Sequence, residues 1–172
     1  MIKAIQTERL TLRGWDVNDF EALANFLTDD ELAKHRGGAV DRVAASNFMS
    51  MVVGQWTLRG YGGFAIEERS QTIVIGMTGL WHPHDFDEPE LYWSLFRGFH
   101  GKGYATEAAA AVRDWAIETK GISIMSFVSP ENIASIKVAE RQGATRGKAR
   151  LSAMSRSSFI TISDNHDKDF SR

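Results

Sequence analysis

The chain has 172 residues, of which 43% are hydrophobic and 24% are charged, with a formal net charge of −2 and no cysteine. This composition predicts one soluble domain, excludes disulfides, thiolate metal sites and a cysteine nucleophile, and argues against sequence-independent nucleic-acid binding, which needs clustered Lys and Arg. No apolar run approaches the roughly 20 residues that span a bilayer, and the first residues do not form a signal peptide, so we expect the cytoplasm.

The first predicted elements are a strand and two helices. Residues 7–13 alternate polar and apolar side chains, as a half-buried strand does. Asp16 can cap a helix, and a second helix is predicted over residues 41–58 after a glycine-containing loop at 34–38. The apolar positions expected on the buried face of the first helix are Val17, Phe20, Leu23, Ala24 and Leu27.

A hairpin is predicted next. Residues 61–67 and 72–81 read as its two strands, with the turn at 69–71. Gly76 and Gly79 in the second strand indicate a bulge or a close approach of two backbones.

The second half alternates strands and helices. Residues 90–96 predict the fourth strand and 105–118 a helix that ends at Gly121. Residues 122–128 predict a fifth strand, parallel to the fourth because a helix lies between them. A short helix follows Asn132 and ends near Gly143, and in the tail only residues 159–162 are strand-like.

A glycine-containing turn lies between the fourth strand and the following helix. Gly101 and Gly103 allow a tight backbone turn, which leaves the amides of residues 101 to 106 directed at one point near the helix start. Such a point suits a phosphate. The dinucleotide fingerprint and the Walker loop are both excluded because their glycine spacings do not fit.

The segment His100-Gly101-Lys102-Gly103-Tyr104-Ala105 resembles the pyrophosphate loop of the GNAT superfamily of acyl-CoA N-acyltransferases, written Gln/Arg-x-x-Gly-x-Gly/Ala. Both small positions match, and His100 replaces the first residue. Four further stretches are similar to the ribosomal-protein alanine N-acetyltransferase (RimJ/RimL-like) branch, and the resemblance extends over roughly residues 5 to 145. These stretches are 7–13, 63–66, 76–80 and Asn132-x-x-Ser135.

The resemblance implies a fold. It implies a single GNAT N-acetyltransferase domain over residues 1–172. The fold class is α/β (α+β), with a mixed central sheet of about six to seven strands flanked by about four helices. The sheet is expected to be splayed between the fourth and fifth strands.

The resemblance also implies acetyl-CoA as co-substrate, bound in the gap between those strands, and no metal. Backbone groups of the fourth strand would pair with the pantetheine amide, the turn would hold the pyrophosphate, and Asn132 and Ser135 would flank the pantetheine arm. Trp93 and Leu95 are also candidate core residues, and Asn132 is also a candidate helix cap. The expected cofactor-binding residues are Trp93, Ser94, Leu95, His100, Gly101, Lys102, Gly103, Tyr104, Ala105, Thr106, Asn132 and Ser135.

The chain departs from the family pattern in three places. His100 weakens the side-chain contact usually made to phosphate. Ala139 occupies a position where many members carry a tyrosine acid, so that phenol is missing. The tail beyond Gly143 does not match the family's last strands well.

Two catalytic residues are proposed from position. Acetyl transfer to an amine needs a base, an oxyanion donor and a proton for the leaving thiolate. Glu90 is the candidate base, with a solvated strand-end charge as the alternative. Ser135 is the candidate acid, with a helix cap as the alternative, and a backbone N–H near Leu95 is the candidate oxyanion donor.

A second polar cluster, His82, His84, Asp85, Asp87 and Glu88, precedes Glu90. Its His-x-His-Asp spacing is compatible with a metal site, but nothing fixes these side chains on one face, so we expect a solvated loop. If the loop lines the acceptor mouth, its carboxylates would attract a cationic amine.

The leading functional hypothesis is an acetyl-CoA-dependent N-acetyltransferase that acts on a primary amine. A protein N-terminus and a small-molecule amine are not separable from sequence, nor are a monomer and a homodimer. The alternative is a non-catalytic acyl-CoA-binding or protein-interaction module with the same fold. No nucleic-acid or membrane partner is expected.

Overall fold

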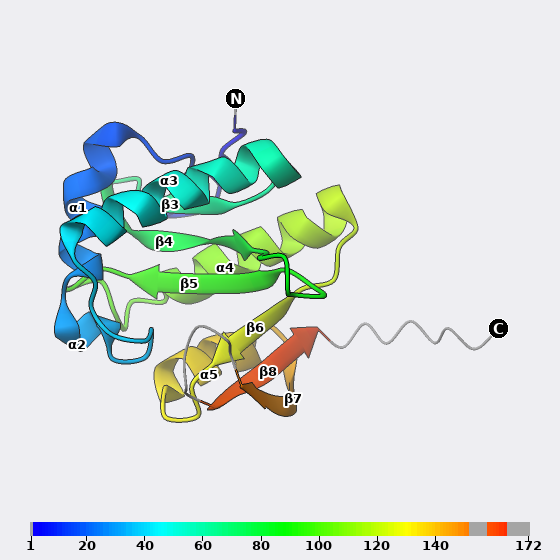
Figure 1. Cartoon of the computed structure of the whole chain (residues 1–172). Coiled ribbons are helices and arrows are strands. Elements are labelled where there is room, and N and C mark those ends of the chain that lie inside the picture. The colour runs from blue at the N-terminus through cyan, green and yellow to red at the C-terminus, as the bar shows by residue number, and fades with distance from the viewer. Residues whose placement is uncertain (1, 152–157, 165–172) are drawn as a thin grey trace.

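The computed structural model describes residues 2–151 and 158–164, and its elements follow the predicted order (Figure 1). The strands are β1 (Ile5–Gln6), β2 (Leu10–Arg13), β3 (Gly63–Glu68), β4 (Ile73–Trp81), β5 (Glu90–Leu95), β6 (Met125–Val128), β7 (Ala144–Leu151) and β8 (Ser158–Asp164). The helices are α1 (Phe20–Leu27), α2 (Asp30–Ala33), α3 (Arg42–Arg59), α4 (Tyr104–Trp115) and α5 (Ile133–Arg141). A 3-10 turn (Val17–Asp19) precedes α1, and a π-helical turn (Ala116–Lys120) continues α4. None of the helices in the described ranges is long and apolar enough to cross a membrane.

The strands of the described residues form one mixed sheet in the order β1-β2-β3-β4-β5-β6-β8-β7. Neighbours are antiparallel except β5 and β6, which are parallel and register only through Glu90 and Met125. Beyond that pair the two strands part. The predicted splay between the fourth and fifth expected strands is therefore confirmed, with the short β1 as an additional strand.

Helices cover both faces of the sheet. In Figure 1, α3 lies across one face and α4 lies behind the other. Alternate β5 residues supply the two cores, because successive side chains of a strand point to opposite faces. Leu91 and Leu95 pack with Val112 of α4, whereas Tyr92, and Phe96 directly after the strand, pack with Met77 and the α1–α3 layer.

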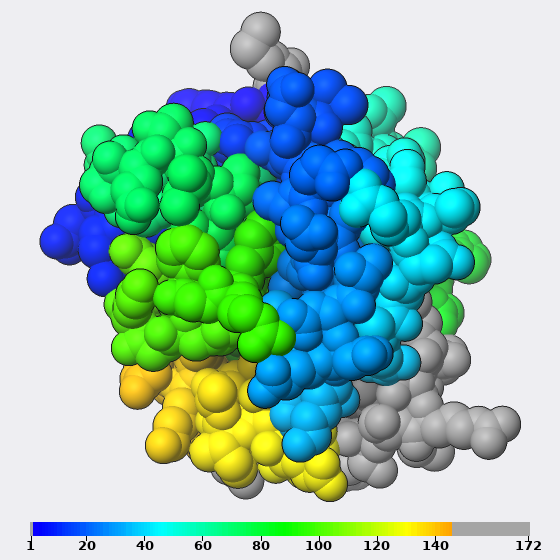
Figure 2. Space-filling view, turned by 90° about the vertical axis from the view of Figure 1, so that its left-hand side faces the viewer, coloured from blue at the N-terminus to red at the C-terminus, as the bar shows by residue number. Residues whose placement is uncertain are grey.

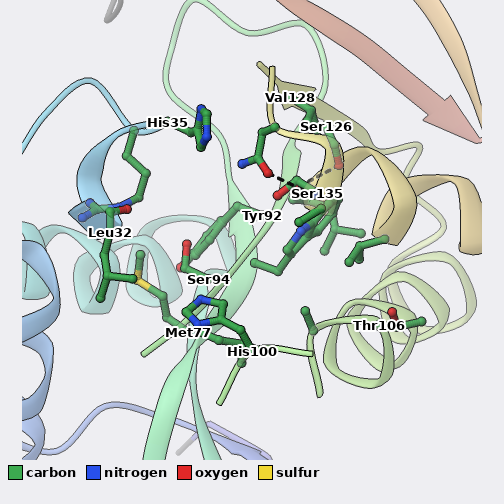
Figure 3. A pocket seen from close by; sticks show the side chains of 18 of the residues that line it. Leu32, His35, Met77, Tyr92, Ser94, His100, Thr106, Ser126, Val128 and Ser135 are labelled. Carbon is green, nitrogen blue, oxygen red and sulfur yellow. Dashed lines mark hydrogen bonds between the residues drawn. The ribbon is translucent and has the colours of Figure 1, made fainter. Parts of the chain in front are cut away.

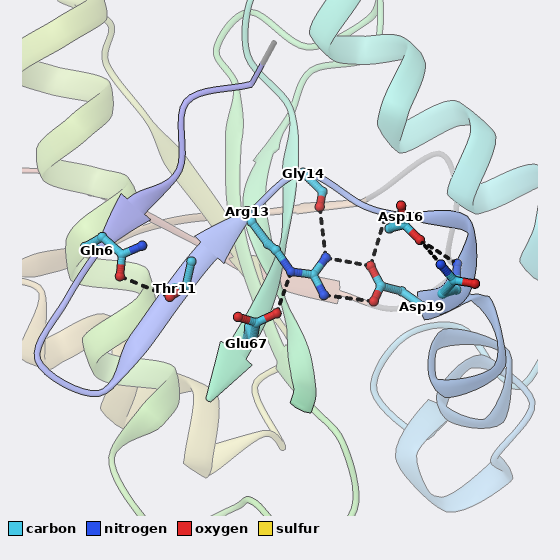
Figure 4. Close-up of polar contacts among 8 residues, drawn as sticks. Gln6, Thr11, Arg13, Gly14, Asp16, Asp19 and Glu67 are labelled. Atoms are coloured by element: carbon cyan, nitrogen blue, oxygen red, sulfur yellow. Dashed lines mark hydrogen bonds and ion pairs between the residues drawn. The ribbon is translucent and has the colours of Figure 1, made fainter. Parts of the chain in front are cut away.

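Arg13 links β2 to the beginning of α1 (Figure 4). Its guanidinium donates to both carboxylate oxygens of Asp19 at 2.7 and 2.9 Å and to Glu67 at 2.7 Å. The Asp19 hydrogen bond is the main cause that raises the pKa of Arg13. Asp19 also accepts the Asp16 backbone N–H at 2.8 Å, which completes a capping box. This network fixes where α1 starts.

Four details of the sequence prediction were wrong or incomplete. Val17 is 79% exposed, because residues 17–19 form a 3-10 turn and the α-helix begins only at Phe20. The four-residue helix α2 was not predicted, since so short a segment has no periodicity to detect. The strand expected over 122–128 begins at Met125. The tail does build two final strands: β8 pairs with β6, and β7 pairs with β8 at the edge of the sheet.

The expected close backbone approach in the hairpin is confirmed. Gly79 has φ 151°, and a Cβ there would lie 2.5 Å from the carbonyl oxygen of Gly62. A register shift between Ile66 and Glu67 also places a bulge in this hairpin. Only glycine fits at position 79, which lets β3 and β4 pack closely.

Candidate functional site

A cavity of about 1450 Å³ occupies the place where β5 and β6 part and extends toward α2 and α3. Figure 3 shows Leu32 and His35 on one side of it and Thr106 and Ser135 on the other, with Tyr92 and Ser94 between them. Segments distant in sequence close around it. Figure 2 shows α1 and α2 in blue beside the green turn that follows β5, with the yellow α5 region below. Arg97 of that turn binds Asp29 at 2.7 Å and Glu31 at 3.1 Å.

The glycine turn has the geometry expected of an anion site. Gly101 and Gly103 have φ of 77° and 82°, and the α4 ladder begins only with the Glu107 N–H bonded to the Gly103 carbonyl at 3.1 Å. Within the described part of the chain, no hydrogen bond from the amides of residues 101 to 106 is found. These donors and the positive end of the helix dipole can bind an anion together.

Not every side chain of the turn reaches the cavity. His100, Ala105 and Thr106 line it, together with the two glycines. The Lys102 ammonium lies over the Phe99 ring, 5.4 Å from its centroid, and the Tyr104 ring lies under the guanidinium of Arg9 at 4.6 Å. Lys102 and Tyr104 can therefore contribute backbone groups to the site, while their side chains pack elsewhere.

Arg9 supports this turn, also lines the cavity and was not predicted as a site residue. Its Nη1 donates to the Lys102 carbonyl at 2.9 Å, and its Nε donates to Glu107 at 2.7 Å. Glu107 also accepts from the Thr7 hydroxyl at 2.6 Å and the Arg9 amide at 2.9 Å. Burial would raise the pKa of Glu107, but these hydrogen bonds outweigh it and lower the pKa. The strand motif at residues 7–13 thus supports the turn almost a hundred residues later.

The edge of β5 that faces the gap carries free backbone groups. In an antiparallel ladder, alternate residues direct both N–H and C=O toward the partner strand. The Phe96 amide bonds to Ile75 of β4, and the Leu91 carbonyl instead accepts from Ser126 of β6 at 2.7 Å. The same alternation turns the backbone of Trp93 and Leu95 toward the gap and that of Ser94 toward β4. The Ser94 side chain lines the cavity.

Glu90 stands at the closed end of the gap, at the one residue pair that joins β5 to β6. It lines the cavity, and no ion pair to it is found among the described residues. Burial raises the pKa of its carboxyl from 4.5 to about 7, against a hydrogen bond from the Phe127 backbone. A carboxyl with this pKa can accept and release a proton near neutral pH.

Tyr92 lies two residues beyond Glu90 on the same face of β5, and sequence reasoning missed it. Its hydroxyl is buried and has no hydrogen-bond partner within the described residues. Burial, and then the charge of Glu90, raise the pKa of this phenol, so it stays neutral. A Cβ at Gly63 would collide with the hydroxyl, which explains the glycine there. The sequence did contain a signal for Tyr92: residues two apart on a strand point to the same face, so Tyr92 should lie beside Glu90.

Asn132 and Ser135 lie at the start of α5 and both line the cavity. The Asn132 Oδ1 accepts the Ser135 backbone N–H at 3.1 Å, so Asn132 is the helix N-cap. This bond uses the amide of Ser135, and its hydroxyl makes no hydrogen bond to another described residue. Ala139 lies one turn later and is buried against Val128 and Ile136.

The polar link before β5 does not gather its acids and histidines. His82 interacts with the Tyr61 hydroxyl at 2.5 Å through Nδ1 and with the Phe86 carbonyl at 3.0 Å through Nε2. His84, Asp85 and Asp87 are exposed. Among residues 2–151 and 158–164, no group of three or more acids and histidines that could hold a metal is found.

Comparison with known proteins identifies related chains. A family model described as an acetyltransferase (GNAT) domain matches residues 9–145. The uncharacterized N-acetyltransferase p20 of Bacillus licheniformis is 28% identical over 141 residues, which are 80% of this chain and 79% of that protein. A solved acetyltransferase from Agrobacterium tumefaciens str. C58 is 34% identical, with a TM-score of 0.86 and 94% of each chain covered. RimL, a ribosomal L7/L12 alpha-N-protein acetyltransferase solved in complex with coenzyme A, shares the fold. Its TM-score is 0.77 at 15% identity, with 94% of this chain and 97% of that chain covered.

Proposed function

Because the chain belongs to the GNAT acetyltransferase family, we propose that it transfers the acetyl group of acetyl-CoA directly to a primary amine. One observation carries the amine assignment. A single cavity joins the glycine turn to Glu90, a carboxyl whose pKa is about 7. The turn suits the pyrophosphate, and Glu90 suits the removal of a proton from an attacking nitrogen.

The described residues supply a path for the donor between these two points. The amides of residues 101 to 106 would hold the pyrophosphate. The open backbone groups of Trp93 and the carbonyl of Leu95 would pair with the pantetheine amides, which leaves the Leu95 N–H for the thioester carbonyl. Asn132 and Ser135 line the opposite side of the cavity. The thioester would then lie between the middle of β5 and the start of α5, with Glu90 beyond it.

The proposed reaction uses three groups of this chain. The amine nitrogen attacks the thioester carbonyl carbon while Glu90, through water, takes a proton from that nitrogen. The Leu95 N–H donates to the carbonyl oxygen as negative charge develops on it. When the C–S bond breaks, the Ser135 hydroxyl donates a proton to the CoA thiolate and is reprotonated by solvent. The products are the amide and CoA thiol, and Glu90 returns its proton to solvent.

The acid–base equipment favours weakly basic acceptors. An α-amine has a pKa near 8 and a lysine side chain one near 10.4, so at pH 7 the neutral form costs about 1.4 kcal/mol for the first and about 4.6 for the second. One half-buried carboxyl covers the smaller cost more readily. We therefore propose α-amines, of proteins or small molecules, over lysine side chains.

The test is an amine panel incubated with acetyl-CoA, in which CoA thiol release and acetylated products are both measured by mass spectrometry. Peptides with a free N-terminus should be acetylated at that nitrogen and faster than Nα-blocked peptides that contain lysine. CoA binding without acetylation of any amine would contradict an N-acetyltransferase activity. Faster modification of lysine would overturn the α-amine preference alone.

A further inference from the structure

The half of the cavity beyond Glu90 has apolar walls that the proposed transfer does not explain. Trp81 pairs with Glu90 across β4 and β5, and the Phe86 ring lies against the Phe127 ring with centroids 5.2 Å apart. Phe48 and Met51 of α3 lie one turn apart and line the same cavity. We refer to this region as the acceptor chamber, defined by Phe48, Met51, Trp81, Phe86, Tyr92 and Phe127.

These side chains are not all sealed in a core. Met51 is 40% exposed, and the other five are half-buried although all are large and apolar. Phe and Met side chains are among those most often fully buried, and an apolar concave surface with a few placed polar groups is characteristic of a ligand pocket. The chamber therefore offers an apolar surface to the substituent on the reacting nitrogen.

The charges around the chamber limit the ligand further. Glu31 lines the cavity but is paired with Arg97, and the Arg36 guanidinium lies over the Phe26 ring, 4.3 Å from its centroid. Arg36 also donates to the backbone carbonyls of Leu32 and Phe26. His35 and the neutral phenol of Tyr92 also line the cavity there. In this half of the cavity, Glu31 is thus paired with Arg97, whereas the described residues place no cation on Glu90.

We infer that the acceptor is a primary amine with a single positive charge and an aromatic or bulky aliphatic body adjacent to the nitrogen. This inference rests on the proposed acetyl transfer to amines and names the class of acceptor. The nitrogen faces Glu90, and the apolar body packs on Phe86, Phe127 and the α3 side chains. Among the described residues that line the cavity, Glu31 and Glu107 are paired with Arg97 and Arg9, so a polyamine finds no unpaired acid there besides Glu90, and burial of its additional charges without a partner is costly.

The experiment uses pairs of amines that differ only in the apolar body. Phe-Gly-Gly and Ala-Gly-Gly have similar α-amines, and 2-phenylethylamine and ethylamine form the small-molecule pair. The aromatic member should have a kcat/KM at least about 10-fold higher, since burial of such a side chain contributes about 1.5 to 3 kcal/mol. Whichever pair is turned over faster distinguishes a peptide source from a free amine. Equal rates within both pairs, or spermidine as the fastest acceptor, would overturn the inference.

Variants distinguish a specific effect of the chamber on acceptor preference from a general loss of activity. Met51→Ala and Phe86→Ala, at exposed and half-buried positions, should reduce the aromatic preference by about 3- to 10-fold. Leu58→Ala is the control, because Leu58 lies on the same helix α3, is 84% exposed and does not line the cavity. A preference unchanged in both chamber variants would contradict the assignment.

A binding measurement distinguishes failure of this inference from failure of the proposed function. The same amines are titrated into the complex of the protein with CoA, and dissociation constants are measured by calorimetry. If no amine is acetylated but the aromatic member binds about 10-fold tighter, the proposed function fails and the inferred ligand class stands. Acetylation of all amines without preference removes the inference and leaves the proposed function intact.

Discussion

The guanidinium of Arg9 and the carboxylate of Glu107 lie 2.7 Å apart and join the beginning of β2 to the first turn of α4. The same Arg9 donates to the Lys102 carbonyl and lines the cavity, so it positions the backbone of the glycine turn from a place beside the site. The segment 7–13 and the glycine turn each resemble the family pattern on their own. The Arg9–Glu107 pair shows that they are in contact and support the same site.

Arg9→Gln should weaken CoA binding by about 5- to 20-fold, because loss of a charge-assisted hydrogen bond leaves the turn less ordered. At saturating acetyl-CoA, kcat should change less than about 2-fold. Calorimetric titration and steady-state kinetics measure the two effects. Arg69→Gln is the matched control, since Arg69 donates to the carbonyls of Thr7 and Glu8 but does not contact the turn. Equal losses in both variants would assign Arg9 only to the fold.

CoA should raise the melting temperature, whereas NAD and ATP at equal concentration should not, because ligands that bind only the native state stabilise it by mass action. Gly103→Glu should abolish this shift, since it places a side chain and a negative charge among the anion-binding amides. Gly121→Ala controls for strain: Gly121 ends the π-helical turn with φ 62° and open space around its Cβ. A normal CoA shift in Gly103→Glu would move the pyrophosphate site elsewhere.

Glu90→Gln should lower kcat/KM at neutral pH by about 10²-fold, in the range of a lost general base. The parent should lose activity as pH falls through about 7, the pKa to which burial raises the Glu90 carboxyl. In the variant the fall of kcat/KM at low pH should depend only on protonation of the amine. The difference in kcat/KM between the variant and the parent should shrink as pH rises. Matching pH profiles for both proteins between pH 6 and 9 would exclude Glu90 as the base.

The same substitution should stabilise the protein at alkaline pH. The folded-state pKa of Glu90 lies above the unfolded value of 4.5, so the native state binds more protons between pH 4.5 and 7 and stability falls as pH rises there. Glu90→Gln should therefore unfold with a free energy about 2 to 3 kcal/mol higher at pH 8, with no gain below pH 4.5. Urea unfolding at both pH values measures this, with Glu88→Gln as the control for net charge. A variant less stable than the parent at pH 8 would mean that the Glu90 charge is not buried.

Ser135→Ala should lower kcat by roughly 10-fold with little effect on stability, because the helix cap uses the Ser135 amide rather than its hydroxyl. Asn132→Ala should instead lower the stability of the fold, since loss of the cap costs about 1 kcal/mol. Thermal unfolding and kinetics of the two variants decide between acid and cap. A Ser135→Ala variant with unchanged kcat would remove the hydroxyl from the reaction.

Sequence patterns predicted the elements in which neighbours along the chain decide the structure. The glycine turn, the Asn132 cap and the β3–β4 hairpin each depend on a few adjacent residues and formed as predicted, whereas Asp16 caps the 3-10 turn that leads into α1 rather than α1 itself. Position in β5 likewise placed Glu90 on the cavity wall.

Features that depend on distant partners were beyond local patterns. Residues 159–162 were predicted as strand-like and lie in β8, whereas β7 was not predicted, and nothing local indicated that β8 would pair with β6 more than thirty residues earlier along the chain. Arg9 and Glu107 are 98 residues apart, and nothing in either segment indicates the pairing. The buried phenol of Tyr92 and the raised pKa of Glu90 both arise from walls contributed by other elements.

The parting of β5 and β6 also divides the folding energetics of the protein. Across this seam the backbone ladder consists of the Glu90–Met125 pair, supported by the Met125 amide on the Pro89 carbonyl at 3.0 Å. Side chains add a few links: Ser126 donates to the Leu91 carbonyl, Gln142 donates to the Thr106 carbonyl, and Arg113 donates to Gln142. Because so few backbone bonds cross the seam, we expect the block formed by β6, α5, β7 and β8 to open locally more readily than β2 to β5, and its amide hydrogens to exchange with solvent sooner. CoA bound as proposed, between Trp93 and Asn132, would link the two sides of the seam. Amide exchange in the smaller block is then expected to slow when CoA binds, and its rate would report how much of the protein holds CoA.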